Sequence, residues 1–371
     1  MQGEKGYKAM DRWHYPRHKL CDYILQGMQQ GLLERVTFFA PRKRGKTQFI
    51  TRDVIPACDN IDVLPIYIDF WSDKDSPQNA FIDAVTTTLE SRRNLFSKIL
   101  AKLKFTPAVS SSGVTVKAEA NATSAQRPTL HSVFDALNTH NTPILLLLDE
   151  VQHLATSADY ASFTAALRSF MTARSDNKIK AIFTGSSQEG LNKLFKNTKA
   201  PFYDASQTIP FPQLDRDFVI HQLGVFKSVT GGRELDEETA FSIFTQQQFH
   251  PARFSEMLKY MALEGIYDIQ VGFDEHDQRY LLNERSEFAK SIEQLNPLDK
   301  TLLKLLAKDW NKGLYTDETK SVLESELGKR PSNPLIGAAL SRLAEQDLIY
   351  NESRGVWLVA DPSLKSFMSD N

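Results

Sequence analysis

The stretch Arg35-Val-Thr-Phe-Phe-Ala-Pro-Arg-Lys-Arg-Gly-Lys-Thr47 decides the fold of this chain. Its first five residues are typical of a short buried strand, and a helical pattern follows Thr47. Between them, Ala40 to Thr47 has the spacing A-x-x-x-x-G-K-T. A tight loop here turns backbone N–H groups inward, and the next helix adds its positive amino end. The stretch therefore predicts a loop that binds phosphate groups.

The side chains of this loop indicate a nucleotide as the phosphate ligand. The Lys46 amine is long enough to reach the β- and γ-phosphates of ATP, and the Thr47 hydroxyl is a ligand for Mg²⁺. Ala40 replaces the glycine usual at the first position, and its methyl group fits if φ is negative. A chance Gly-Lys-Thr in a basic turn is the alternative, which the strand–loop–helix context disfavours. We expect ATP contacts from Ala40, Pro41, Arg42, Lys43, Arg44, Gly45, Lys46, Thr47 and Gln48.

A second strand supplies the acids that such a site needs. Ile144-Leu-Leu-Leu-Leu148 is uniformly apolar and runs into Asp149 and Glu150. We expect Asp149 to hold Mg²⁺ together with Thr47, directly or through water. Glu150 is then the residue that orients or deprotonates the attacking water. The alternative is a buried strand that merely ends at a polar turn.

Two further polar residues are candidates for sensing the terminal phosphate. Ser186 follows the apolar segment 179–184, and we expect it beside Glu150, with Thr184 and Ser187 as near alternatives. An ordinary turn that uses glycine and serine would explain the same residues.

The second candidate is Arg253, which follows His250-Pro251. Proline suits the first turn of a helix, so Arg253 can reach back to the phosphates from a second, helical domain. The alternative is a surface arginine beside a helix start.

Apolar segments that alternate with helical patterns define the fold class as α/β. They predict a parallel sheet with helices on both faces. The expected strands cover residues 35–39, 63–69, 144–148, 179–184 and 207–211, the last weakened by Pro210. The expected helices include 17–33 and 76–103. Residues 105–127, with an alternating stretch at 113–119, are typical of an insertion.

The pattern becomes almost entirely helical after the fifth strand. We expect a P-loop ATPase domain over 1–213, a helical lid over 214–295 and a winged helix over 296–371. The last region has three helical stretches and then two short strands, 348–350 and 356–359. That order of elements is typical of a winged helix.

Composition places the chain among ordinary globular proteins. Of its 371 residues, 41% are apolar and 24% charged, and the net charge of −2 gives no overall attraction to nucleic acid. The cysteines, Cys21 and Cys58, lack metal-ligand spacing and fit a reducing compartment. The polar N-terminus lacks a signal region, and the apolar run 144–148 is too short to span a bilayer. We therefore expect a cytoplasmic protein without membrane contact.

Together these motifs resemble the AAA+ group, and within it the archaeal-type ATPase family related to the signal-transducing NTPases. The loop that ends at Thr47 is similar to the family's Gly-Pro-Arg-x-x-Gly-Lys-Thr form. Further similarity covers most of the chain. It lies in Pro16-Arg17-His-Lys-Leu20, the stretch 109–119, Leu167-Arg-Ser169, Phe183-Thr-Gly-Ser186, Ala200-Pro-Phe-Tyr203, His250-Pro251, Asp347-Leu-Ile-Tyr350 and Asp361-Pro-Ser-Leu364.

The resemblance implies an AAA+-like fold, the use of Mg²⁺ and ATP, and three further nucleotide contacts. It places Arg17 under the adenine, and His250 and Pro251 beside the nucleotide. In this chain His18-Lys19 lacks the family's acidic residue, and Gln248-Phe249 replaces its Gly-Gly, which favours a stiffer hinge. The family's members are diverse, so the resemblance implies no particular partner or pathway.

Three functions fit these observations. The first is an ATP-driven conformational switch that acts on a protein partner of unknown identity, as a monomer or a homo-oligomer. The second is a DNA-associated ATPase, similar to origin-binding or transposition-regulating AAA+ proteins. The third is a nucleotide-binding scaffold that hydrolyses little.

The distribution of positive charge argues against DNA binding by the expected winged helix. The expected recognition helix, 333–347, carries only Arg342, whereas a DNA reader concentrates positive charge there. The basic run from Arg92 to Lys104 is the better electrostatic candidate, with a solvated helix face as its alternative. Other residues of the winged-helix region that can contact phosphates are Lys329, Arg330 and Arg354.

Fast hydrolysis in such enzymes depends on an arginine that stabilises the transition state, worth roughly 10³–10⁵ in rate. The segment 190–206, before the fifth strand, contains no arginine. Its basic residues are Lys193, Lys196 and Lys199. Because lysine lacks the planar fork of a guanidinium, we expect slow intrinsic hydrolysis. Arg168 and Arg174 are the best candidates for such an arginine placed elsewhere.

Overall fold

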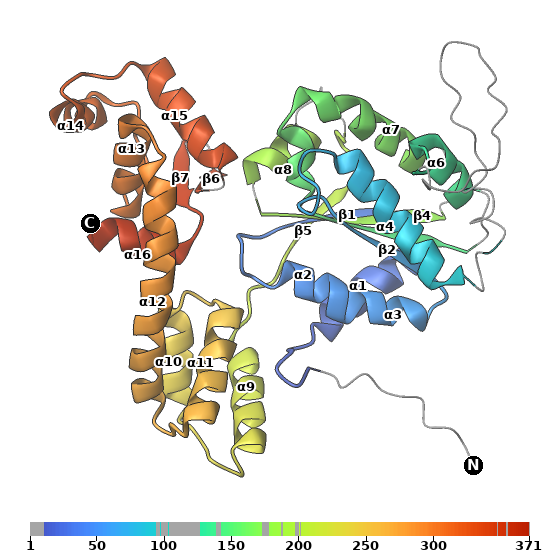
Figure 1. Cartoon of the computed structure of the whole chain (residues 1–371), viewed down its shortest axis with the longest axis horizontal. Coiled ribbons are helices and arrows are strands. Elements are labelled where there is room, and N and C mark those ends of the chain that lie inside the picture. The colour runs from blue at the N-terminus through green and yellow to red at the C-terminus, as the bar shows by residue number, and fades with distance from the viewer. Residues whose placement is uncertain are drawn as a thin grey trace, which may run out of the picture.

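Five parallel strands form the central sheet of the protein, seen here in a computed structural model (Figure 1). The structure describes residues 11–93, 97, 103, 127–138, 142–172, 178–186, 188–196, 200, 202–346, 348–353 and 355–370. The strands lie in the order β2-β3-β4-β1-β5, and each neighbouring pair is parallel. Their bounds are β1 (Arg35–Phe39), β2 (Leu64–Asp69), β3 (Ile144–Asp149), β4 (Ile179–Gly185) and β5 (Gln207–Pro210).

The parallel sheet confirms the predicted fold class, and the strand bounds agree with the predicted ones within one or two residues. Every residue of β3 is buried, as its uninterrupted apolar sequence requires of a strand covered on both faces. Pro210 ends β5 at the edge of the sheet, opposite Phe39. An edge position tolerates a residue that cannot donate to the ladder, so Pro210 does not prevent the strand.

Helices cover both faces of the sheet (Figure 1). On one face, apolar side chains of α1 (His18–Gln29) and of the helix after the loop pack under β1 and β3. On the other face lie α4 (Pro77–Ser91), α6 (Leu130–Asn138), α7 (Ala161–Thr172) and α8 (Gln188–Phe195). Two short 3₁₀ helices, η2 (Val151–Ala155) and η3 (Ala158–Tyr160), follow β3.

The helix after the loop is not regular along its length. It starts as α2 (Lys46–Gln48), widens into a π-helical segment, η1 (Phe49–Val54), and continues as α3 (Ile55–Asp59). Pro56 lacks the N–H that would bond to the carbonyl of Arg52 in an α-helix, which accounts for irregular pairing in this segment. The helical run nevertheless carries its amino end at the loop and its apolar side into the core.

One of the predicted helices is shorter than expected, and a second is described only in part. The helix predicted over 17–33 is observed as α1, which ends at Gln29 before a turn at Gly31 with φ of 73°. The helix predicted over 76–103 is described as α4 up to Ser91, and most of residues 94–102 lie outside the described part of the chain. The predicted insertion, 105–127, lies outside it as well, except for Arg127.

A helical unit follows the sheet. It consists of α9 (Arg216–Val229), α10 (Glu237–Gln246), α11 (Pro251–Glu264) and α12 (Ile269–Glu293). The first three helices and the start of α12 share an apolar core of their own. Trp13 and Tyr15 pack against this core, and the Trp13 carbonyl accepts a 2.8 Å hydrogen bond from Gln222. The N-terminal segment therefore joins the helical unit to the sheet.

The last unit has the element order predicted for a winged helix. Its helices are α13 (Pro297–Ala307), α14 (Asp317–Leu327) and α15 (Asn333–Glu345), followed by the antiparallel strands β6 (Ile349–Ser353) and β7 (Val356–Val359) and by α16 (Pro362–Asp370). Residues 292–368 supply a separate apolar core. The long helix α12 leads from the helical unit into this one (Figure 1). The domain boundaries at 213 and 295 stay predictions.

The winged-helix unit touches the sheet near the loop. The rings of Tyr350 and Phe39 lie 6.1 Å apart, which places β6 beside the end of β1. Asp361 forms a 3.0 Å ion pair with Lys43 of the loop. Because Lys43 belongs to the predicted phosphate loop, the last unit contacts the candidate site directly.

Candidate functional site

The loop between β1 and α2 has a backbone that only a special sequence adopts easily. Lys43 and Gly45 have φ values of 64° and 87°, in the left-handed region. A methyl group on Gly45 would meet no atom within 4 Å, so conformation rather than space requires glycine there. Helix α2 begins at Lys46, immediately after this turn. The helical run therefore starts where the loop closes, as the sequence predicts for a phosphate site.

The Lys46 side chain is 5% exposed and lies inside the loop. Its Nζ donates hydrogen bonds to the carbonyl oxygens of Ala40 at 2.6 Å and Pro41 at 3.0 Å. Burial lowers the pKa of Lys46 to about 8, and the carboxylates of Glu150 and Asp149 oppose this shift. The amine is thus held by backbone acceptors where an anionic ligand would compete for it.

The Asp149 carboxylate is 1% exposed and is surrounded by hydroxyl donors. Thr47 donates to its Oδ2 at 2.7 Å and Tyr67 donates to the same oxygen at 3.1 Å. Thr184 donates to Oδ1, which also accepts the backbone N–H of Glu150 at 3.1 Å. Burial raises the pKa of Tyr67, which keeps its hydroxyl protonated as a donor. The predicted neighbours Thr47 and Asp149 are therefore brought together.

These oxygens suit a magnesium ion that arrives with a nucleotide. Mg²⁺ binds through one or two protein oxygens and completes its shell with water and substrate phosphate. Asp149 and Thr47 present one carboxylate and one hydroxyl within hydrogen-bonding distance of each other. Within the described residues, no cluster of three or more His, Cys, Asp or Glu residues forms a metal site by itself. The donor set therefore fits a phosphate-bound ion better than an all-protein cage.

Glu150 follows β3 with φ of 53°, which turns its side chain away from the strand direction. Ser186 donates a 2.8 Å hydrogen bond to Oε2 of Glu150, so the expected neighbours are adjacent. The Gln152 amide donates to the same carboxylate oxygen and to Ser186 Oγ at 3.2 Å. Sequence analysis missed Gln152, although its place two residues after Glu150 was the available signal.

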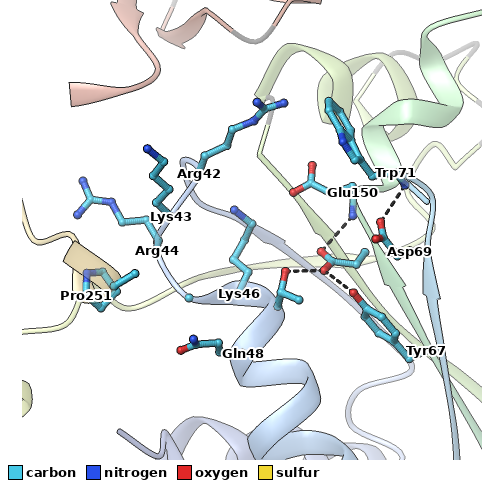
Figure 2. Close-up of a pocket in the computed structure, with 14 residues that line it drawn as sticks. Arg42, Lys43, Arg44, Lys46, Gln48, Tyr67, Asp69, Trp71, Glu150 and Pro251 are labelled. Atoms are coloured by element: carbon cyan, nitrogen blue, oxygen red, sulfur yellow. Dashed lines mark hydrogen bonds between the residues drawn. The ribbon is translucent and has the colours of Figure 1, made fainter. Parts of the chain in front are cut away.

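A cavity of about 450 Å³ lies at the carboxyl ends of β2 and β3 and collects these groups (Figure 2). One side is basic and comes from the loop residues Arg42, Lys43, Arg44 and Lys46. The other side carries Tyr67, Asp69, Trp71, Asp149 and Glu150. The remaining lining residues are Gly45, Thr47, Gln48, Pro251 and Ala252. Basic and acidic walls that face each other suit an anionic ligand together with a divalent cation.

A smaller cavity of about 120 Å³ adjoins the first and lies between the N-terminal segment and α11. The two cavities share Gly45, Gln48, Pro251 and Ala252. The aromatic residues that line the smaller cavity are Trp13, His14, Tyr15, Phe49 and Phe218. His14 also forms a 2.7 Å contact with Asp53, which is buried there. The smaller cavity therefore combines aromatic rings with polar and charged side chains, directly beside the basic wall of the first cavity.

Arg17 and Arg44 connect the loop to neighbouring segments. The Arg17 guanidinium lies over the Phe211 ring at 4.3 Å and donates to the carbonyl oxygens of Pro212 and Arg44. Burial lowers the pKa of Arg17 to about 10. Arg44 donates to the carbonyl oxygens of Gln248 at 2.7 Å and Phe249 at 3.0 Å. The loop therefore holds the segment that leads into α11.

Of the remaining predicted contacts, His250 and Pro251 start α11. The His250 Nδ1 accepts the backbone N–H of Arg253 at 3.1 Å, and Pro251 lines both cavities. Gln248 and Phe249, which stand where the resembling family has glycines, have φ values of 53° and 56°. These two residues thus adopt the left-handed backbone that glycine favours.

Arg253 does not line either cavity. Its side chain is 10% exposed, forms an ion pair with Asp277 of α12 and lies 4.5 Å from the centre of the Tyr280 ring. The structure therefore places the predicted phosphate-sensing arginine inside the helical unit, pointed at α12. Its sensing role stays a prediction.

The candidates for a transition-state cation are dispersed. Arg168 is exposed on α7, and Lys196 is exposed after α8. Lys193 lies 4.0 Å from Glu345 of the winged-helix unit. Arg174 and Lys199 lie outside the described residues. So does Ser187, the alternative to Ser186 for sensing the terminal phosphate. None of the described candidates lines the cavity of about 450 Å³ beside the loop, called the phosphate cavity below.

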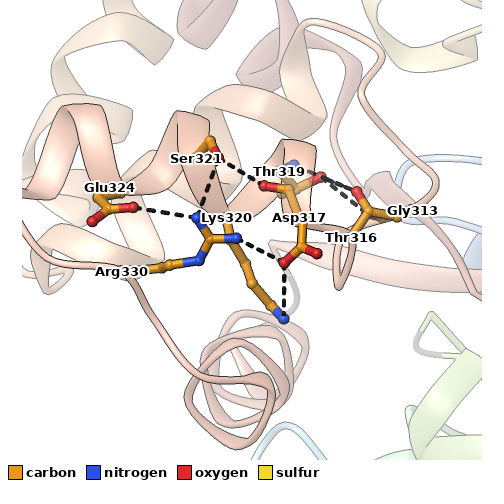
Figure 3. A network of polar contacts seen from close by, with 8 residues as sticks. All are labelled: Gly313, Thr316, Asp317, Thr319, Lys320, Ser321, Glu324 and Arg330. Atoms are coloured by element: carbon orange, nitrogen blue, oxygen red, sulfur yellow. Dashed lines mark hydrogen bonds and ion pairs between the residues drawn. The ribbon is translucent and has the colours of Figure 1, made fainter.

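Three of the arginines proposed for DNA contact are paired with carboxylates. Arg342 donates to both oxygens of the buried Asp299, at 2.6 and 2.9 Å. Arg330 bonds to Asp317 at 2.7 Å and to Glu324 at 3.5 Å (Figure 3). Arg92 pairs with Asp59 in the same way. Arg354, Lys98, Lys102 and Lys104 lie outside the described residues.

No described helix is both long enough and apolar enough to cross a membrane.

Comparison with known proteins gives structural matches only. No protein-family model and no curated protein sequence matches this chain. The structure is similar to the Walker-type ATPase PABY2304 of Pyrococcus abyssi, with a TM-score of 0.68 and 16% identity over 96% of this chain and 99% of that one. It is also similar to the ORC2 protein of Aeropyrum pernix in its ADPNP-ADP complexes, with a TM-score of 0.56 and 13% identity over 99% and 97% of the two chains. At such identities the matches establish the fold, so this chain has the overall fold of these proteins along nearly its whole length.

Proposed function

We propose that this protein is an AAA+-like ATPase that binds Mg²⁺ and ATP between Lys46 and Asp149 and responds with a conformational change. One observation carries the proposal: Lys46, Thr47 and Asp149, from two segments distant in sequence, meet at a single cavity that joins a second, aromatic one. The nucleotides named for the ORC2 protein of Aeropyrum pernix, ADPNP and ADP, support a nucleotide ligand in this fold.

In this proposal each wall of the site has one task. The loop backbone and Lys46 bind the β- and γ-phosphates, and the aromatic cavity beside Pro251 takes the base. Asp149 and Thr47 hold Mg²⁺, which would neutralise phosphate charge when bound. Glu150 accepts a proton from the attacking water, and Ser186 donates a hydrogen bond that fixes its carboxylate.

The conformational response is supported by the contacts of the loop. Lys43 pairs with Asp361 of the winged-helix unit, and Arg44 holds two carbonyl oxygens just before α11. Both side chains line the cavity in which the phosphates would bind. A bound polyphosphate therefore competes with the winged-helix unit and the helical unit for the same two cations. The Lys43–Asp361 contact is a partly exposed ion pair, a kind that contributes only about 0–1 kcal/mol, so a bound polyphosphate can displace it.

We infer slow hydrolysis for the isolated chain. Among the described residues, no arginine outside the loop lines the phosphate cavity. A protein partner, or a second copy of the chain, that supplies such an arginine would raise the rate. The DNA-associated alternative gains no support from Arg342, Arg330 or Arg92, because carboxylates already pair with all three.

The test of the catalytic part is steady-state phosphate release by the wild type and by Glu150→Gln, with ATP binding measured in parallel. We expect Glu150→Gln to bind ATP as tightly as the wild type and to lose turnover by roughly 100-fold or more, because it cannot accept the proton. Turnover by Glu150→Gln at the wild-type rate would remove Glu150 from the proposed role.

A further inference from the structure

Gln152 lies in η2, two residues after Glu150, and is 5% exposed. Its Nε2 donates hydrogen bonds to Oε2 of Glu150 and to Oγ of Ser186. Since Ser186 donates to the same Glu150 oxygen, the three side chains form a closed triangle. Glu150 Oε2 thus receives two donors, while Oε1 receives no hydrogen bond from the described residues. One carboxylate oxygen is fixed and the other is free to meet a ligand.

The surroundings of Gln152 are shaped to hold its amide in this orientation. A methyl group on Gly185 would lie 2.7 Å from Oε1 of Gln152 and 2.8 Å from a methyl carbon of Leu191. Gly185 ends β4, so the missing side chain leaves room for the amide between the sheet and α8. Any larger residue at position 185 would displace Gln152.

The buried amide of Gln152 also makes an unfavourable contribution to the free energy of folding, which an apolar side chain would not make. Oε1 of Gln152 is buried and has no hydrogen-bond partner among the described residues. A buried acceptor without a partner is unfavourable, and an apolar side chain of the same length would not incur that cost. Donation from Nε2 to Glu150 and Ser186 is therefore the feature that distinguishes glutamine from methionine at this position.

We propose that Gln152 is the positioning residue of Glu150: it fixes Oε2 so that Oε1 faces the cavity and accepts a proton from the attacking water. The inference rests on the proposed function, because the task of Glu150 belongs to it. Gln152 itself touches no ligand, since it does not line the phosphate cavity.

Substitution by methionine separates positioning from packing, because it keeps the length and removes the donor. In Gln152→Met we expect kcat to fall roughly tenfold or more, with the KM for ATP unchanged, since a base displaced by about 1 Å loses rate without losing substrate. If Gln152 only fills space, its replacement by methionine should leave kcat unchanged, because methionine occupies a similar volume.

Gly185→Ala provides an independent displacement of the same amide, and we expect it to reproduce the fall in kcat with KM unchanged. The matched control is Gln246→Met, which changes an exposed glutamine of α10 and should leave kcat and KM unaltered. A kcat within about twofold of the wild type in Gln152→Met would overturn the inference.

A measurement that needs no turnover distinguishes failure of this inference from failure of the proposed function. The side-chain amide signal of Gln152 is identified in ¹⁵N-labelled protein by its loss in Gln152→Met. We expect this signal to move in Glu150→Gln at constant pH, because the charged acceptor of the Gln152 amide becomes a neutral one. That result supports the contact even if turnover is too slow to detect. An amide signal that stays in place in Glu150→Gln would contradict the inference.

Discussion

Thr47 Oγ1 donates a 2.7 Å hydrogen bond to Oδ2 of Asp149, and so joins the first turn after the loop to the end of β3. If this pair holds Mg²⁺, Thr47→Val removes one ligand oxygen and one donor to a buried carboxylate. We expect affinity for ATP in the presence of Mg²⁺ to fall about tenfold or more, since hydrogen bonds to charged groups contribute roughly 1.5–3 kcal/mol.

The matched control for this pair is Thr51→Val, one turn further along the helical run. The Thr51 hydroxyl donates only to the Thr47 carbonyl, at 2.8 Å. Its loss should leave the effect of Mg²⁺ on ATP affinity unchanged. The measurement is a titration of ATP with and without Mg²⁺. Equal magnesium dependence in both variants would remove Thr47 from the metal site.

The low pKa of Lys46 predicts proton uptake on binding. Burial lowers this pKa from 10.5 to about 8, so at about pH 9 the amine of the empty protein is mostly neutral. Phosphate favours the ammonium form, so ATP binding at that pH should take up a proton, whereas at about pH 7 the amine is already charged. Calorimetry in two buffers of different ionisation enthalpy measures the uptake. A proton count that is the same at both pH values would contradict the assignment.

The lowered pKa of Lys46 also makes the stability of the folded protein depend on pH. Between the folded value of about 8 and the unfolded value of 10.5, the unfolded chain binds more protons at Lys46 than the folded one. The contribution of this group therefore makes the empty protein more stable as pH rises through that window. Bound phosphate should reduce this dependence, because it raises the folded pKa of the amine.

Asp361 and a phosphate ligand compete for Lys43 in the proposed switch. Asp361→Asn should therefore raise ATP affinity by about two- to fivefold, the range of an exposed ion pair. In a Lys43→Ala background the same substitution should have no effect, because the shared partner is gone. By linkage, ATP must weaken the contact of the winged-helix unit with the loop by the same factor.

The control for this cycle is Asp309→Asn, which removes a more exposed carboxylate that pairs with Lys365 in the same unit. It should leave ATP affinity unaltered. An Asp361→Asn effect that persists without Lys43 would show that charge at long range, rather than this contact, couples the two sites.

Arg342 is expected to act in stability. Asp299 is 2% exposed and accepts two hydrogen bonds from Arg342, so Arg342→Ala leaves a buried carboxylate with a weaker set of partners. We expect a loss of about 2 kcal/mol or more, seen as faster amide exchange in α13 and α15. Arg330→Ala, whose partners are exposed, should have little effect. Equal exchange in both variants would show that the Arg342–Asp299 pair is not structural.

Much of the fold was predictable from the sequence because its strands are buried on both faces. An uninterrupted apolar run marks β3, a mostly apolar one marks β4, and the A-x-x-x-x-G-K-T spacing fixes the loop between β1 and α2. These are local signals, so the strand ends and the loop were predicted within one or two residues. The helix 17–33 was predicted too long, because the prediction ran past Gly31, which adopts the left-handed backbone typical of a helix C-terminus.

Contacts between distant segments were predictable only where a motif pairs them. The loop and the acidic strand end implied that Thr47 meets Asp149, and they do meet. Nothing local indicated that Gln152 bonds to Ser186, or that Asp361 reaches Lys43, because these contacts depend on how the units pack. For the same reason the sequence did not reveal that Asp277 holds Arg253 away from the cavity.

Binding of ATP to Lys46→Ala, measured by calorimetry in the presence of Mg²⁺, tests the central claim most directly. The matched control is Lys227→Ala, which removes an exposed lysine of α9 that pairs with Glu234. We predict that the control binds ATP like the wild type, whereas Lys46→Ala binds more than about 100-fold more weakly, a loss of roughly 2.8 kcal/mol. Equal affinity of Lys46→Ala and the wild type would contradict the account.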